Sequence, residues 1–166
     1  MKRKSVRIYS FTGTGSRLAL NLAEKLKQEG YVCTGYTVAR FAEDKRLQRL
    51  NDGWKQEIGA SWGEHALVFI GAAGIAIRAI APFVKDKFTD PPVIVLDEKG
   101  TFAIPLLSGH VGGGVTLAKV LAEYTGGRAV ITTATDVQKK FAADVFAMEN
   151  GLVITCLLYT SPSPRD

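Results

Sequence analysis

Short apolar runs alternate with amphipathic stretches along most of this chain. The runs predict strands at Val6–Phe11, Tyr31–Val38, Ala66–Ile70, Val93–Leu96, Phe102–Leu106 and Arg128–Thr132. Apolar residues that recur every three or four positions predict helices at Ser16–Glu29, Ile75–Ile80 and Gly112–Tyr124. The polar stretch from Ala39 to Trp62 predicts short helical pieces. Strands that alternate with helices are typical of α/β proteins.

The run Ala66–Ile70 is apolar without interruption, as expected at the buried centre of a parallel sheet. We therefore predict an α/β fold with an open, mostly parallel sheet and helices on both faces (Rossmann-like), truncated at the C-terminus. Residues 1–136 form the predicted N-terminal α/β domain.

A helix at Val137–Glu149 and a strand at Leu152–Thr155 are predicted to begin a second region, residues 137–155. Residues 156–166 then break the pattern with two Ser-Pro pairs and no periodicity. We expect this tail to be non-native, because it resembles translated adapter sequence, and we expect the natural protein to continue past about residue 155.

Composition narrows the class of partner. The formal net charge is +5, which favours an anionic ligand, but the basic residues are scattered and argue against nucleic acid. No apolar run reaches the roughly 18 residues that span a bilayer, so no membrane partner is expected. Cys33 and Cys156 are the only thiols, too few for a disulfide framework or a zinc site, and a reducing, cytoplasmic setting is predicted.

Ligands of open α/β sheets bind outside the carboxyl ends of the strands, and several loops follow predicted strands. The first loop, residues 12–16, begins like a dinucleotide fingerprint, but Leu18 stands where the third glycine belongs. A structural strand-to-helix turn is therefore favoured over a phosphate site.

The second loop contains Gly71 and Gly74 and leads to Arg78, which is expected in the first turn of its helix. A cation is slightly unfavourable there, so Arg78 is a candidate ligand for a carboxylate. An ordinary surface arginine is an equally good interpretation.

The third loop, Pro105–Gly114, is the richest in candidate chemistry. Its glycines free backbone N–H groups for an anion, and His110 is suited to proton transfer. Residues 109–116 nearly match a P-loop, but Val115 replaces the required lysine. His110 as a structural histidine remains the alternative, and His65, at the start of a buried strand, is expected to be structural.

Two further groups follow strands. Residues 132–136 offer three hydroxyls and the carboxylate of Asp136, which suit a polar ligand or a helix cap. Glu98, beside Asp97, is a further candidate, although these acids also suit a hairpin turn with Gly100.

Several phrases in a fixed order resemble the CbiG family of cobalamin biosynthesis. They are Phe69–Pro82, Asp90–Glu98, Leu106–Gly113 and Val130–Asp136, followed by Phe141–Asp144 and Asn150–Leu152, which resemble the start of the family's middle region. The family has Ala-Asn after the paired glycines, where this chain has Gly114-Val115.

The resemblance implies a cobalt-precorrin-5A hydrolase, which opens the δ-lactone of a cobalt-corrinoid and releases acetaldehyde to give cobalt-precorrin-5B, a carbon–carbon bond cleavage. It implies no cofactor, since cobalt is carried by the substrate, and no separate metal site. The implied partners are the anionic corrinoid and a missing C-terminal domain of the same protein. A non-catalytic tetrapyrrole-binding module and, less favoured, a nucleotide-binding protein are the alternatives.

We place the roles from chemistry. His110 is predicted to activate water or take up a proton, and Asp136 or Glu98 to orient or assist. The predicted substrate-binding residues are glycines, hydroxyl residues and one arginine: Gly71, Gly74, Arg78, Ser108, Gly109, Gly112, Gly113, Thr133 and Thr135.

Overall fold

The computed structural model describes residues 5–86, 88–109 and 112–133. The chain divides into two compact units, residues 1–131 and 132–166, and each is considered by itself. The boundary predicted at residue 136, the elements predicted over 137–155 and the tail 156–166 all lie outside the described residues.

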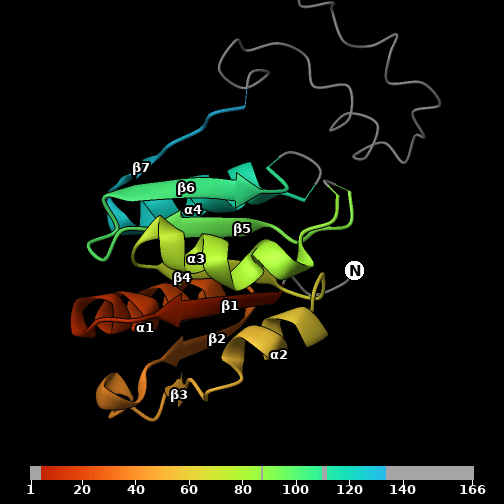
Figure 1. Ribbon diagram of the computed structural model, residues 1–166. Helices are drawn as coiled ribbons and strands as arrows, with labels where there is room; N and C mark the ends of the chain where they lie inside the picture. The colour runs from red at the N-terminus through yellow and green to blue at the C-terminus, as the bar shows by residue number, and fades with distance from the viewer. Residues whose placement is uncertain (1–4, 87, 110–111, 134–166) are drawn as a thin grey trace, which may run out of the picture. The chain divides into compact units, whose positions relative to one another are not determined.

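The first unit is built on one sheet of seven strands in the order β3-β2-β1-β4-β5-β6-β7 (Figure 1). The strands are β1 (Ser5–Ser10), β2 (Val32–Thr37), β3 (Leu47–Arg49), β4 (Ala66–Ile70), β5 (Val93–Leu96), β6 (Phe102–Leu107) and β7 (Arg128–Ala129). The helices are α1 (Gly13–Gln28), α2 (Trp54–Ala60), α3 (Ala73–Ile80) and α4 (Gly114–Thr125), with short 3₁₀ turns η1 (Ala39–Phe41) and η2 (Ala81–Phe83).

The first five strands are parallel, and the chain then reverses. β5 and β6 pair antiparallel, with Leu96 opposite Ala103 and Val93 opposite Leu107. β7 runs parallel to β6 and therefore shares its reversed direction. In Figure 1 the arrow of β6 points opposite to those of β1 and β5. The predicted open, mostly parallel α/β sheet is confirmed.

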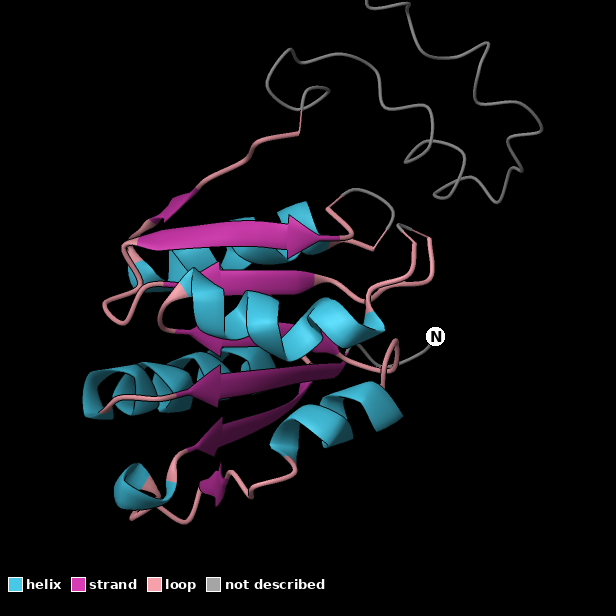
Figure 2. Cartoon of the chain, in the orientation of Figure 1, coloured by secondary structure: helices cyan, strands magenta, loops and turns pink. Residues whose placement is uncertain are grey.

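Helices cover both faces of the sheet (Figure 2). Apolar residues of α1 and α4, such as Leu22 and Leu121, pack with Ile8 of β1 in one buried cluster. The other face buries Ile58 of α2 and Ile80 of α3 against neighbouring positions of the same strands. Alternate residues of a strand point to opposite faces, so the apolar runs of the central strands supply both clusters.

The structure changes two details that matter for the site. The polar stretch after Val38 contains the helical pieces expected, but also the edge strand β3, which the sequence did not predict. Helix α3 begins at Ala73, earlier than predicted, so Arg78 lies in its last turn and not in its first. A cation is favourable there, which removes the dipole argument for a ligand at Arg78.

Other boundaries also differ, and helix α1 starts at Gly13 instead of Ser16. Helix α4 starts at Gly114 instead of Gly112, and β7 has only two residues where Arg128–Thr132 was predicted. No helix in the described part of the chain is both long and apolar enough to cross a membrane.

Candidate functional site

One edge of the sheet gathers the loops that follow β1, β4 and β5. Thr12 is the N-cap of α1, and its Oγ1 accepts a hydrogen bond of 3.0 Å from the Gly15 amide. The same hydroxyl donates to Oε2 of Glu98 at 3.0 Å. Thr12 therefore joins two loops of this edge, and the strand-to-helix turn favoured from the sequence has a visible structural role.

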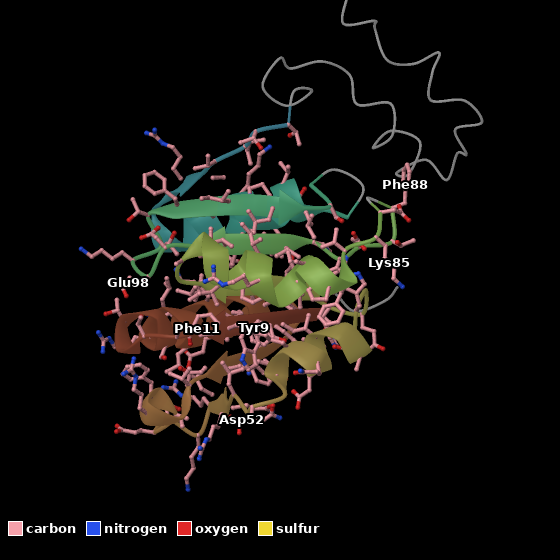
Figure 3. The ribbon with its side chains drawn as sticks, in the orientation of Figure 1. Tyr9, Phe11, Asp52, Lys85, Phe88 and Glu98 are labelled. Atoms are coloured by element: carbon pink, nitrogen blue, oxygen red, sulfur yellow. The ribbon has the colours of Figure 1, made fainter. Side chains whose placement is uncertain are left out.

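Glu98 and its neighbour Asp97 serve different purposes. Asp97 accepts hydrogen bonds from the amides of Lys99, at 3.1 Å, and Phe102, at 2.7 Å, and so closes the β5–β6 hairpin. Glu98, labelled in Figure 3, is exposed. One of its carboxylate oxygens accepts the hydrogen bond from the Thr12 hydroxyl. The hairpin therefore depends on Asp97, and Glu98 remains accessible at the edge.

The loop after β4 holds Gly71, Gly74 and Arg78 at this same edge. Gly71 has a φ of +149°, where a side chain is strained, and its amide donates to the Leu96 carbonyl at 2.8 Å. A Cβ on Gly74 would lie 3.1 Å from Nη1 of Arg78. The Arg78 side chain thus folds back toward the start of α3, over the space that glycine leaves open.

Beside Arg78 lies an open cleft of about 530 Å³. It is lined by residues of the loops that follow β1, β2 and β3 and by α2 and α3, among them Phe11, Arg49, Asp52, Trp54 and Lys55. Crevices at the carboxyl ends of strands are where ligands of open α/β sheets bind. Except for Arg78, the sequence predicted none of these residues, because the segment around Asp52 reads as a polar turn.

Phe11 and Trp54 are the aromatic residues of the lining, and the buried Tyr9 packs against Trp54. The ring of Trp54 lies 5.7 Å from that of Phe11 and 5.8 Å from that of Tyr9, centroid to centroid. Burial raises the pKa of Tyr9 to about 12, so its hydroxyl stays neutral at physiological pH. Figure 3 labels Tyr9 and Phe11 near the end of β1 and Asp52 below them.

The glycine-rich loop lies at the opposite edge, because β6 runs against β5. Ser108 has a φ of +51°, and its Oγ donates to the Asp90 carbonyl at 2.6 Å. The Ser108 carbonyl accepts from the Gly114 amide at 3.0 Å, and the Gly109 carbonyl from the Val115 amide at 2.9 Å. These two amides of α4 are therefore already paired within the loop.

Two more glycines of this loop are required by its geometry. A Cβ on Gly112 would lie 2.8 Å from the Ser108 carbonyl oxygen. Gly113 has a φ of +78° as the N-cap of α4. Both residues let the backbone turn back on Ser108, so their presence has a structural explanation whatever the loop binds.

Asp90 supports this opposite edge. It is 6% exposed, and its carboxylate accepts from Nε1 of Trp62 at 2.9 Å and from the Lys85 amide at 2.9 Å. Since the Asp90 carbonyl holds the Ser108 hydroxyl, Asp90 connects the segment before β5 to the loop after β6. In Figure 3 Lys85 and Glu98 are labelled at opposite ends of the sheet.

The predicted site residues therefore do not form one site in the first unit. Gly71, Gly74, Arg78 and Glu98 share one edge, whereas Ser108, Gly109, Gly112 and Gly113 share the other. Strand β6 alone, six residues long, separates the edges by about 20 Å at roughly 3.3 Å per residue.

The other predicted residues are described only in part. His110, Thr135 and Asp136 lie outside the described residues. Thr133 is half-buried and belongs to the second unit. His65 lies 2.8 Å from the Ser5 hydroxyl through Nδ1, and burial lowers the pKa of its ring, in keeping with a structural histidine.

Comparison with known proteins gives a consistent result. Residues 58–136 match the family model described as cobalamin synthesis G N-terminal. Through this region the chain is similar to the CbiG family. The chain is 39% identical, over 159 residues, to a cobalt-precorrin-5A hydrolase of Salmonella typhimurium, and 32% identical, over 157 residues, to one of Priestia megaterium.

These matches cover nearly all of this chain but less than half of each relative. They cover 90% and 92% of this chain but 41% of each relative, so the chain spans about two fifths of the length of these relatives. The crystal structure of a protein described as a cobalamin biosynthesis protein G homolog from Sulfolobus solfataricus superposes with a TM-score of 0.60 at 26% identity. That superposition covers 77% of this chain and 36% of the other.

Proposed function

We propose that this chain is the N-terminal part of a cobalt-precorrin-5A hydrolase. The observation that carries the proposal is the 39% identity, over nine tenths of the chain, to the Salmonella relative of that name. Identity at this level along almost the whole chain supports a shared role as well as a shared fold. The relatives' names indicate a hydrolase of cobalamin synthesis.

The proposed reaction has a hydrolytic and a carbon–carbon step. Water adds to the lactone carbonyl and the ring C–O bond breaks, which leaves a carboxylate and an alkoxide. The alkoxide oxygen becomes the carbonyl oxygen of acetaldehyde as its carbon separates from the macrocycle, and the electron pair of the broken bond stays on the macrocycle. The protein has to hold the carboxylate arms and move protons, while cobalt belongs to the substrate.

The two edges of the sheet divide these tasks in the proposal. Arg78, beside Gly74, provides a guanidinium for carboxylates at the carboxyl edge. His110, in the glycine-rich loop, is the proposed proton-transfer group. The described loop residues Ser108 and Gly109 lie about 20 Å from the carboxyl edge, so they and Arg78 would contact different parts of a bound substrate. Glu98 belongs with Arg78, and the proposed roles of Asp136, Thr133 and Thr135 concern the region that follows.

The distance of about 20 Å between the two edges of the sheet favours a second candidate function, a binding module without catalytic activity. Such a module binds the tetrapyrrole, and a further domain supplies the catalytic groups. For binding alone, the cations and aromatic residues at the carboxyl edge are sufficient. The proposed partner in that case is the C-terminal domain of the same protein.

Anaerobic incubation with cobalt-precorrin-5A tests both candidates. We expect acetaldehyde from the wild-type chain, and at least a tenfold slower release from His110→Ala if the histidine transfers a proton. Substrate binding without acetaldehyde, in a sample whose fold is verified by circular dichroism, would assign the chain to the binding module. Unchanged turnover in His110→Ala would remove the histidine from the mechanism.

A further inference from the structure

The cleft at the carboxyl ends of β1, β2 and β3 concentrates positive charge from three separate elements. Arg49 is the last residue of β3 and pairs in register with Thr37 of β2. Lys55 lies in the first turn of α2, and Arg78 on α3. Asp52 is the one acidic residue among the described residues of the lining, so three cations share the cleft with a single carboxylate.

Among the described residues, no acid lies within ion-pair distance of these three cations. In the described part of the chain, the ion pairs within 4 Å join Arg46 to Glu24 and Asp44, and His65 to Glu64. Arg49, Lys55 and Arg78 take part in none of them. Three exposed cations around one hollow, each without an ion-pair partner among the described residues, raise the local concentration of an anion.

The lining also offers apolar ring surface from Trp54 and Phe11, whose ring planes are inclined at 51°. Trp54 is half-buried and is fixed by ring contacts with Tyr9, Phe11 and Phe69 at centroid distances of 5.8, 5.7 and 6.5 Å. The Lys55 Nζ lies 5.6 Å from the Trp54 ring centroid. An aromatic wall beside unpaired cations suits a ligand that is planar on one side and carries anionic arms at its rim.

We propose that this cleft grips one edge of a planar macrocycle, with Arg49, Lys55 and Arg78 binding its carboxylate arms and Trp54 and Phe11 lying against its ring. This inference rests on the proposed function for its choice of a tetrapyrrole. The volume of about 530 Å³ is in the range of small-ligand sites, and the cleft is open, so the rest of the macrocycle extends out of it.

A nucleotide offers a similar combination of ring and charge, and the experiment separates the two. The probes are cobyrinic acid, a cobalt corrinoid with free carboxylate arms, cobinamide, in which those arms are amides, and ATP. Isothermal titration calorimetry on the full chain measures each affinity. We expect cobyrinic acid to bind at least tenfold more tightly than cobinamide and ATP, and its affinity to fall with added salt.

Variants locate the binding. Arg49→Ala combined with Arg78→Ala is expected to weaken cobyrinic acid at least tenfold, since each guanidinium loses a charge-assisted contact. Arg46→Ala is the matched control: Arg46 is also an exposed arginine, immediately before β3, but its guanidinium is already paired with Glu24 and Asp44. The control is expected to bind within twofold of the wild type.

The results separate the cleft from the enzymatic proposal. Unchanged affinity in the double variant, an equal loss in Arg46→Ala, tighter binding of ATP, or no binding of cobyrinic acid by the folded chain would each overturn the cleft. If the double variant releases acetaldehyde with an unchanged KM, the proposed binding of the macrocycle in the cleft is refuted, but the proposed hydrolase function is not. Cleft-dependent binding of cobyrinic acid without acetaldehyde would support the cleft although the hydrolase proposal fails for this chain.

Discussion

Gly74→Ala is the sharpest perturbation of the carboxyl edge, because it adds one methyl group beneath the Arg78 guanidinium. The new Cβ would lie 3.1 Å from Nη1, whereas comfortable contacts begin near 3.5 Å. Arg78 is exposed and its end is flexible, so it can move by about half an ångström without cost to the core.

The effects on stability and on binding should have opposite signs. Gly74 is the second residue of α3, and alanine there is expected to stabilise the fold by about 0.5 kcal/mol, because glycine loses more backbone entropy in a helix. A displaced guanidinium loses alignment with a carboxylate. If that costs about 1 kcal/mol of a charge-assisted hydrogen bond, the affinity for cobyrinic acid falls about fivefold.

Urea unfolding and calorimetric titration on the same preparation measure both quantities. A more stable variant that binds more weakly cannot be explained by partial unfolding, which is why this substitution is more informative than Arg78→Ala. Binding as tight as in the wild type would refute the idea that Gly74 positions Arg78 for a ligand. A loss of stability would refute the assumption that Arg78 moves freely.

Three further predictions concern the fold. In Gly127→Ala the new Cβ would lie 2.8 Å from the Thr101 carbonyl oxygen, and the free energy of unfolding in urea should fall by about 3 kcal/mol. Gly126→Ala has open space around the new Cβ but a φ of +68°, and its free energy of unfolding should fall by about 1 kcal/mol. Equal losses in the two variants would contradict a steric cause. Leu121→Ala removes a fully buried side chain and should cost about 3 kcal/mol by the same assay. Burial raises the pKa of the Cys33 thiol to about 11, so in a Cys156→Ser background a disulfide reagent should label the native chain slowly at pH 8 and the urea-unfolded chain quickly. Because the unfolded thiol ionises first, stability should also fall as the pH rises from about 9 toward 11, and a flat profile would argue against burial.

The sequence predicted the central strands and the two long helices well, because burial on both faces leaves continuous apolar runs and amphipathic periods. It missed β3, whose three residues lie at the sheet edge with only Leu47 buried. It also placed the start of α3 too late. The stretch from Gly71 to Ile80 is apolar almost throughout, so it has no polar face from which a helical period can be read.

The position of the candidate site was harder to predict, although one signal was present. The link between β5 and β6 is a tight turn closed by Asp97 and Gly100, and so short a connection joins antiparallel strands only. That turn alone implies that the loop after Leu107 lies at the far edge from Glu98. The residues that line the cleft could not be predicted from a local turn. Phe11, Arg49 and Trp54 come together only because β1, β2 and β3 pair in the sheet.

Net charge and the location of charge are separate properties of this chain. A formal charge of +5 predicts an anionic partner but does not say where it binds. Arg46 and Arg78 are both exposed arginines, and the sequence singled out Arg78 only by a helix-dipole argument that the structure removes. In the structure, Arg46 lowers the pKa of Asp44 to about 2 and is occupied by that pairing, while Arg78 faces a hollow with two other unpaired cations. The absence of a partner for Arg78 among the described residues, and not the number of basic residues, is what marks the carboxyl edge as the place where an anion gains most by binding.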